Sequence, residues 1–176
     1  MRLFIAIDCN GVAKELCSLQ TSLLPIKCKF TKDYHLTLKF LGEVNDHELQ
    51  QIINQLKLID HQAFELTLSS IGLFTTHGQK NIWCGLNESA KLIDLQSDID
   101  ACLGNYFKPN NQFIPHITLA RINKKMMQKG ADELLEKLIK KGAASALLKV
   151  SRFHLMASDI KGSEPRYKCI KSFALK

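Results

Sequence analysis

Two short segments of the chain pair a histidine with a threonine two positions later. They read His-Leu-Thr-Leu at residues 35–38 and His-Ile-Thr-Leu at residues 116–119, and both stand in apolar surroundings. Side chains at positions i and i+2 of a strand point to the same face. Each histidine would therefore share a face with its threonine, while the apolar residues of the segment pack on the other face.

Paired histidines suit general acid and general base catalysis. Because an unperturbed histidine titrates near pH 6.5, one of a pair can accept a proton at neutral pH while the other donates one. Cleavage of a phosphodiester needs such a base, such an acid, and donors to the non-bridging phosphate oxygens. Thr37 and Thr118 are candidates for those donors. The scheme needs no metal ion, and the sequence has no His-x-x-x-His segment that would suggest one.

The composition predicts a folded protein. The chain has 176 residues, of which 45% are hydrophobic and 23% charged, enough for one domain or two closely packed lobes. No apolar run approaches the roughly 20 residues that cross a bilayer, and the start of the chain lacks the pattern of a signal peptide. We therefore expect a cytosolic protein with no membrane partner.

The distribution of charge along the chain and the spacing of the cysteines limit the possible functions further. Residues 121–176 hold 14 Lys and Arg against 5 Asp and Glu, whereas residues 1–120 hold 10 against 12. The basic segment at residues 121–176 forms either a solvated lysine-rich face or a surface that attracts a polyanion such as RNA. The six cysteines form no Cys-x-x-Cys pair, which fits neither a disulfide framework nor a zinc site. We expect them to be reduced and mostly structural.

Strand and helix periodicities alternate along the chain, and no low-complexity linker divides it. The predicted strands span residues 2–8, 26–30, 35–41, 64–68, 81–86, 113–121, 146–158 and 166–175. The predicted helices run from Val12 to before Pro25, over 46–57 from an Asn45–Glu48 capping box, over 90–103 and over 131–141, and residues 161–165 read as a loop. Two similar halves facing each other would bring the two motifs together in a cleft.

These segments together resemble the two-histidine (2H) phosphoesterases. Within them, the chain is similar to the RNA 2′,3′-cyclic phosphodiesterases of the LigT or ThpR type, also called 2′-5′ RNA ligases. The sequence segments that carry the resemblance lie at residues 2–8, 35–44, 72–74, 115–121 and 166–167. They are spread over nearly the whole chain. The resemblance implies an α+β, bilobal, pseudo-twofold fold, with two antiparallel sheets flanking a central cleft and helices on the outer faces. Residues 1–176 would form a single domain of two similar intertwined lobes.

The resemblance also implies an activity and roles for residues. The activity is hydrolysis of RNA 2′,3′-cyclic phosphate ends to 2′-phosphomonoesters without a metal or other cofactor. Reversible 2′-5′ RNA ligation would follow where a 5′-hydroxyl RNA end replaces water. His35 would be the proton donor and His116 the proton acceptor, with Thr37 and Thr118 gripping the phosphate. Two further residues are candidates for substrate binding. Lys39, four positions after His35, shares its face by strict alternation, whereas Arg121, five positions after His116, does so only if the strand bends.

Other interpretations remain open at the level of sequence. One is a 2H phosphoesterase that acts on a small cyclic phosphate, such as ADP-ribose cyclic phosphate or a nucleotide. Another is a non-catalytic RNA-binding domain. The expected partner is RNA with a 2′,3′-cyclic phosphate terminus, such as a tRNA fragment, and we expect a monomer with no obligate protein partner. Among the aromatic residues, Phe40, Phe74 and Trp83 are predicted to lie in the core, and Tyr167 either stacks on a base or is buried.

Overall fold

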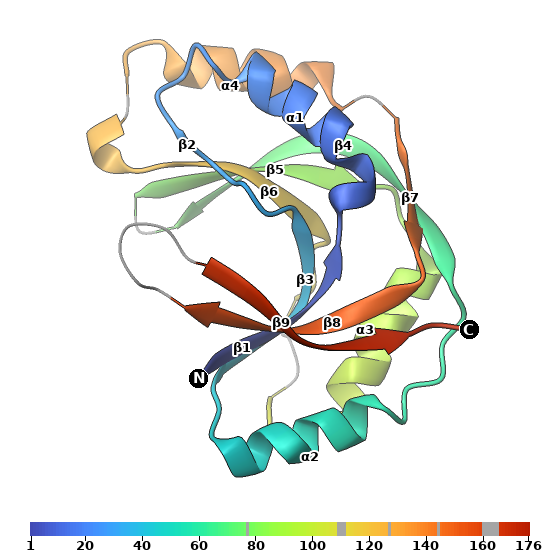
Figure 1. Ribbon diagram of the computed structural model, residues 1–176. Helices are drawn as coiled ribbons and strands as arrows, with labels where there is room; N and C mark the ends of the chain where they lie inside the picture. Colours follow the sequence, from blue (N-terminus) through green and yellow to red (C-terminus); the bar gives the residue numbers. More distant parts are fainter. Residues whose placement is uncertain (77, 109–111, 127, 144, 160–165) are drawn as a thin grey trace.

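The computed structural model of the chain describes residues 1–76, 78–108, 112–126, 128–143, 145–159 and 166–176 (Figure 1). Its strands are β1 (Arg2–Asp8), β2 (Lys29–Phe30), β3 (His35–Glu43), β4 (Phe64–Thr76), β5 (Gln79–Leu86), β6 (His116–Ile122), β7 (Leu147–Val150), β8 (Arg152–Asp159) and β9 (Arg166–Ala174). Its helices are α1 (Ala13–Ser22), α2 (Asp46–Leu56), α3 (Ala90–Cys102) and α4 (Ala131–Lys141), with short 3-10 turns η1 (Asn10–Val12) and η2 (Lys124–Met126). The α+β class is confirmed, and the predicted loop at 161–165 lies outside the described residues.

The predicted elements are found, although β4 extends to Thr76, well beyond the strand predicted at residues 64–68. Asn45 caps α2 through a complete capping box with Glu48, as the spacing of the two residues indicates. The predicted strand at 146–158 is two strands, because β7 pairs with β4 while β8 pairs with β1 and β9, and Ser151 lies between them. The short strand before the first motif is only two residues long.

Two antiparallel halves meet in the middle of the sheet. The strand order is β7-β4-β5-β6-β3-β1-β8-β9, with β2 beside β6, and every pairing is antiparallel. The β3 and β6 strands carry the two His-x-Thr motifs and are joined through one pair, Leu36 with Ile117. The two sheets expected from the sequence are thus hydrogen-bonded into one path. The motifs lie on the two strands at the junction.

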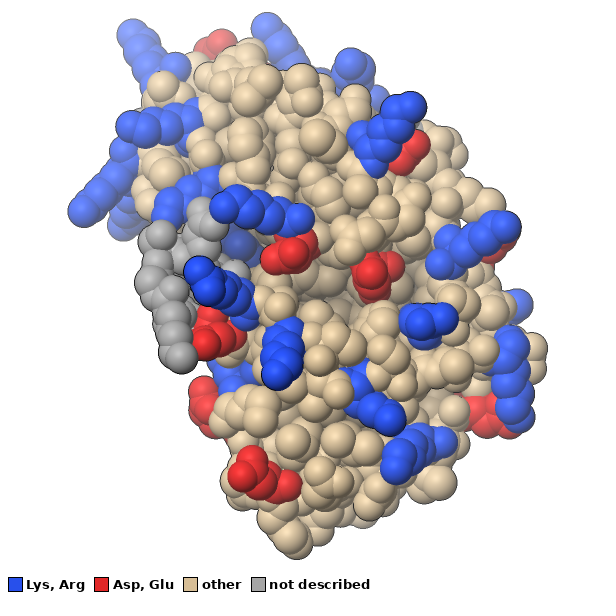
Figure 2. All heavy atoms as spheres, in the orientation of Figure 1, with Lys and Arg blue, Asp and Glu red and all other residues tan. Residues whose placement is uncertain are grey.

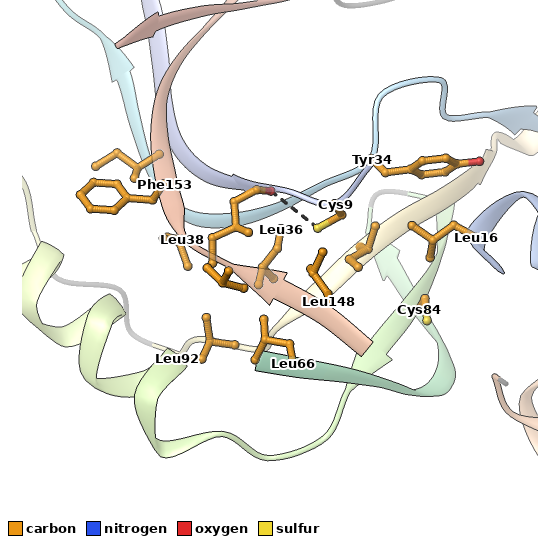
Figure 3. Packing of buried hydrophobic residues seen from close by; sticks show 14 of the residues in the cluster. Cys9, Leu16, Tyr34, Leu36, Leu38, Leu66, Cys84, Leu92, Leu148 and Phe153 are labelled. Carbon is orange, nitrogen blue, oxygen red and sulfur yellow. Dashed lines mark hydrogen bonds between the residues drawn. The ribbon is translucent and has the colours of Figure 1, made fainter. Parts of the chain in front are cut away.

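One apolar cluster underlies both halves. Figure 3 shows Leu36 and Leu38 of β3 in the same cluster as Leu66 of β4 and Leu148 of β7. The helices cross between the halves, since α1 contacts β6 and α3 contacts β3. In Figure 1, α1 and α4 lie at the top of the view and α2 and α3 at the bottom. Within the described ranges, no helix is long and apolar enough to cross a membrane.

Candidate active site

The four motif residues face one cavity. Leu36 and Ile117 are fully buried at the junction of β3 and β6, so the residues on either side of them in each strand point to the opposite face. That face borders a cavity of about 330 Å³, and its lining includes His35, Thr37, His116 and Thr118. The structure therefore brings together the four residues that the sequence singled out, although they lie up to 83 positions apart in the chain.

Both histidines are held in the same way by the backbone. Nδ1 of His35 lies 3.1 Å from the carbonyl oxygen of Asp33, and Nδ1 of His116 lies 2.8 Å from that of Ile114. A carbonyl oxygen only accepts, so each Nδ1 carries the hydrogen and donates it. This fixes the tautomer and leaves Nε2 of each ring as the atom that can exchange a proton with a substrate.

Aromatic rings fix the plane of each imidazole. The His35 ring lies 4.9 Å from Tyr167 and 5.2 Å from Phe4, measured between ring centroids. The His116 ring lies 5.0 Å from Phe74, edge to face, and 6.1 Å from Trp83. Such contacts restrict rotation about χ2, because a displaced imidazole would collide with an aromatic ring. The two histidines are therefore preorganised for proton transfer before any substrate arrives.

Glycine at position 72 makes room for one of these rings. Gly72 pairs with Trp83 across β4 and β5, and a Cβ atom at position 72 would overlap the indole. The indole Nε1 is buried and has no hydrogen-bond partner among the residues that the structure describes. The Gly72–Phe74 segment noted in the sequence thus supports the His116 side of the cavity, with Gly72 admitting Trp83 and Phe74 contacting the imidazole.

A bulge in β3 places Lys39 on the face away from the cavity. The register with β1 runs from Thr37 opposite Ala6 to Lys39 opposite Ile5, so Leu38 is an extra residue. Alternation is interrupted there, and Leu38 and Lys39 are both buried. Lys39 is only 1% exposed, and its Nζ donates to Asp100 Oδ1 at 2.5 Å and to the carbonyl of Lys108 at 2.8 Å. Lys39, predicted to contact substrate, is therefore not among the described residues that line this cavity.

The same bulge brings Phe40 to the cavity. Phe40 lies one residue beyond the interruption, so it returns to the face of His35 and Thr37, lines the cavity and is 69% exposed. Its predicted place in the core is wrong for that reason. Phe74 also lines the cavity rather than the core, and Trp83 is half-buried. An exposed phenylalanine at the rim offers a flat apolar surface on which a nucleobase can stack.

An equivalent bulge in β6 brings Arg121 to the cavity. Trp83 lies opposite Thr118 and Ile82 lies opposite Ala120, so Leu119 is the extra residue. Leu119 and Ala120 are both buried, and Arg121 then points to the face of His116 and lines the cavity. Arg121 and Phe40 are thus in equivalent positions of the two halves, five residues after their histidines. The two halves differ at this pair, since one presents a cation and the other an aromatic ring.

Burial controls the protonation of His35. Burial lowers the pKa of the His35 imidazole below its usual 6.5, and the nearby charges of Arg121 and His116 lower it further, against the raising effects of the Asp33 carbonyl and carboxylate. In the ligand-free protein at neutral pH, His35 is therefore mainly neutral. A phosphate anion in the cavity favours the protonated form and raises the pKa, so substrate itself would charge this residue for proton donation.

An NMR titration checks this account of His35. We expect the His35 ring signals of the free protein to give a pKa below 6.5, and Arg121→Gln to raise it because one unfavourable charge is removed. The pKa should remain below 6.5 in the variant, since burial is the larger cause. Because the buried ring disfavours its charged form, this group favours folding above pH 6.5, and the advantage is lost as the pH falls through the lowered pKa. A pKa at or above 6.5 in the free protein would contradict the account.

We expect Lys39 to raise the free energy of unfolding of the protein. Asp100 is 14% exposed and also accepts a hydrogen bond from Gln96 at 2.8 Å. Lys39→Met keeps the length of the side chain but removes the ammonium group that donates to this carboxylate, so we expect unfolding in urea to show a loss of about 3–5 kcal/mol. The double variant Lys39→Met/Asp100→Leu should recover most of it, since an apolar pair replaces the buried ions. A Lys39→Met protein as stable as the wild type would overturn this role.

Comparison with known proteins identifies the family of the chain. Residues 31–161 match the family model of the 2′-5′ RNA ligase superfamily. The chain belongs to this superfamily. Among its curated relatives, an RNA 2′,3′-cyclic phosphodiesterase of Methanocaldococcus jannaschii is 29% identical over 98% of this chain and 100% of the relative. Another, from Archaeoglobus fulgidus, is 25% identical over 98% of this chain and 99% of its own length.

Solved structures of similar proteins support the fold. Escherichia coli LigT in apo form superposes with a TM-score of 0.79 at 25% identity, over 99% of this chain and 96% of LigT. Its complex with 3′-AMP gives a TM-score of 0.78 at 24% identity, over 99% and 97% of the two chains. The α+β fold expected from the resemblance is confirmed by this structural match.

Several residues that line the cavity were not predicted from the sequence to lie in the site. They line the cavity with the motif residues and include Arg2, Phe4, Phe40, Phe74, Gln79, Asn81 and Ser158. Tyr167 also lines it, half-buried and with its edge against His35. In the parts of the chain that the structure describes, no group of three His, Cys, Asp or Glu side chains is arranged to hold a metal ion. All six cysteines are free.

Proposed function

We propose that the protein hydrolyses the 2′,3′-cyclic phosphate at the 3′ end of RNA to a 2′-phosphate, without a metal ion. The observation that carries the proposal is the pair of backbone-anchored histidines that face one cavity together with two threonine hydroxyls. The names of the curated relatives support the same reaction class and the same kind of RNA end.

Each residue has a defined task in the reaction. Nε2 of His116 removes a proton from water as the water oxygen forms its bond to phosphorus. The bond from phosphorus to the 3′ oxygen breaks, and Nε2 of His35 gives that oxygen its proton. The Thr37 and Thr118 hydroxyls donate to the non-bridging oxygens, and Arg121 adds a charged donor. After turnover His116 has gained a proton and His35 has lost one, and exchange with solvent restores both.

The same ring opening can use a second nucleophile. If the 5′-hydroxyl of a second RNA takes the place of water, the same two proton transfers produce a 2′-5′ phosphodiester. Phe40 is placed to stack on the terminal base with either nucleophile, because it is exposed at the rim beside Phe4. A cytosolic location, a monomeric state, a single domain over residues 1–176 and tRNA fragments as natural substrates remain our predictions.

Labelled water tests the proposed reaction. An oligoribonucleotide ending in a 2′,3′-cyclic phosphate, incubated with the protein in H₂¹⁸O and EDTA, should give a 2′-phosphate that carries one ¹⁸O atom, read by mass spectrometry. The matched control is the same oligonucleotide ending in a 3′-phosphate, which should not react because it lacks the cyclic diester. Absence of ¹⁸O in the product, or turnover that EDTA abolishes, would contradict the proposal.

A further inference from the structure

A second cavity lies next to the first, beside β2. It has a volume of about 350 Å³ and shares Gln79, Arg121 and Tyr167 with the cavity of the two histidines. Lys29 and Lys32 also line it. A chain bound by its end in the first cavity can therefore continue into the second without leaving the protein surface.

Two cations lie opposite each other in this second cavity. Lys29 of β2 pairs with Arg121 of β6 in the antiparallel register, and directly opposed residues project to the same face. Like charges in this arrangement destabilise a sheet. Within the described part of the chain, neither Lys29 nor Arg121 forms an ion pair with a carboxylate. An anion bound between them would remove the repulsion.

The third neighbouring cavity has the opposite charge. It measures about 330 Å³, shares His35 and Tyr167 with the first, and is lined by Asp8 and Asp33 but by no lysine or arginine among the described residues. Asp33 borders the second cavity too, where three cations outnumber it. In Figure 2, Lys and Arg side chains predominate at the upper left, where Figure 1 places η2 and the nearby end of the sheet. A polyanion that leaves the first cavity is therefore drawn toward the second and repelled by the third.

We propose that the second cavity binds the phosphate attached to the 5′ oxygen of the terminal nucleotide, held between Lys29 and Arg121. The inference rests on the proposed function, because it assumes that the cyclic phosphate lies between the histidines. Phe30 and Met126, which also line the second cavity, give an apolar surface for the nucleoside that precedes this phosphate. The protein would then favour RNA ends over free cyclic nucleotides through a contact that a mononucleotide lacks.

A pair of small substrates isolates this contact. Adenosine 2′,3′-cyclic phosphate and its 5′-phosphorylated form differ only by the phosphate in question. For the wild type we expect kcat/KM to be about tenfold or more higher for the 5′-phosphorylated form, the size of one hydrogen bond between charged groups. The advantage should shrink as salt rises from about 50 to 200 mM.

Variants assign the advantage to the proposed residue. Lys29→Gln should reduce the ratio of the two kcat/KM values to near one, whereas Lys91→Gln, an exposed lysine of α3 outside the three cavities, should retain the wild-type ratio. Circular dichroism would establish that both variants are folded. A ratio of kcat/KM values near one in the wild type, or an unchanged ratio in Lys29→Gln, would overturn this inference but not the proposed function. Failure to open either compound or a cyclic-phosphate oligonucleotide would instead overturn the proposed function.

Discussion

Replacement of His35 or His116 by alanine is expected to lower kcat for opening a 2′,3′-cyclic phosphate by about 10²–10⁴-fold. This is the usual contribution of a positioned acid or base. Both side chains line the cavity and neither belongs to the apolar cluster, so the variants should remain folded. Rapid-quench assays with an oligoribonucleotide substrate would measure the loss, and urea unfolding would confirm the fold. A folded variant that retains wild-type kcat would contradict the two-histidine scheme.

A substrate with sulfur at the 3′ bridging position separates the two histidines. A thiol has a pKa near 8.5, far below that of an alcohol, so a thiolate departs without receiving a proton. We therefore expect this substrate to restore much of the lost activity to His35→Ala, the variant without its proton donor. His116→Ala should not recover, because its water still lacks a base. The opposite pattern would reverse the two roles.

Removal of either threonine hydroxyl should reduce kcat by about 10²–10³-fold. Thr37 and Thr118 flank the junction of β3 and β6 with their histidines, and each hydroxyl can donate to a phosphate oxygen as charge develops there. Thr37→Val and Thr118→Val keep the shape of the side chain while deleting the donor. Single-turnover kinetics at saturating substrate would measure the effect on the chemical step.

Serine at the same positions is the matched control. Thr37→Ser and Thr118→Ser retain the hydroxyl, so their kcat should stay within about tenfold of the wild type, well above that of the valine variants. If serine and valine reduced kcat equally, the methyl group and its packing would be responsible, and the role of the hydroxyls in holding phosphate would be lost.

The central residues of the site could be predicted because strand parity is a local property. His35 and Thr37 share a face through the pleat alone, and so do His116 and Thr118. Repetition of the motif on two predicted strands was enough to place four residues in one cleft. The strand and helix positions followed from periodicity in the same way, including the capping box of α2.

The rim of the site could not be predicted, because it depends on pairing between strands. The sequence of residues 35–41 does not predict a bulge at Leu38, because the bulge is defined by the register of β3 with β1. Because of that one extra residue, Phe40 lines the cavity and Lys39 does not. The matching bulge at Leu119 turns Arg121 toward the cavity. The partner of Lys39, Asp100, lies 61 positions away on α3, so only the folded chain shows that this lysine is structural.

The most direct test compares the wild type with the His35→Ala/His116→Ala double variant. Both would be incubated in EDTA with an oligoribonucleotide ending in a 2′,3′-cyclic phosphate, and the product isomers would be resolved by chromatography against 2′- and 3′-phosphate standards. We predict that the wild type produces the 2′-phosphate and that the folded double variant produces none. A 3′-phosphate product, equal conversion by both proteins, or no conversion by the wild type would contradict the account.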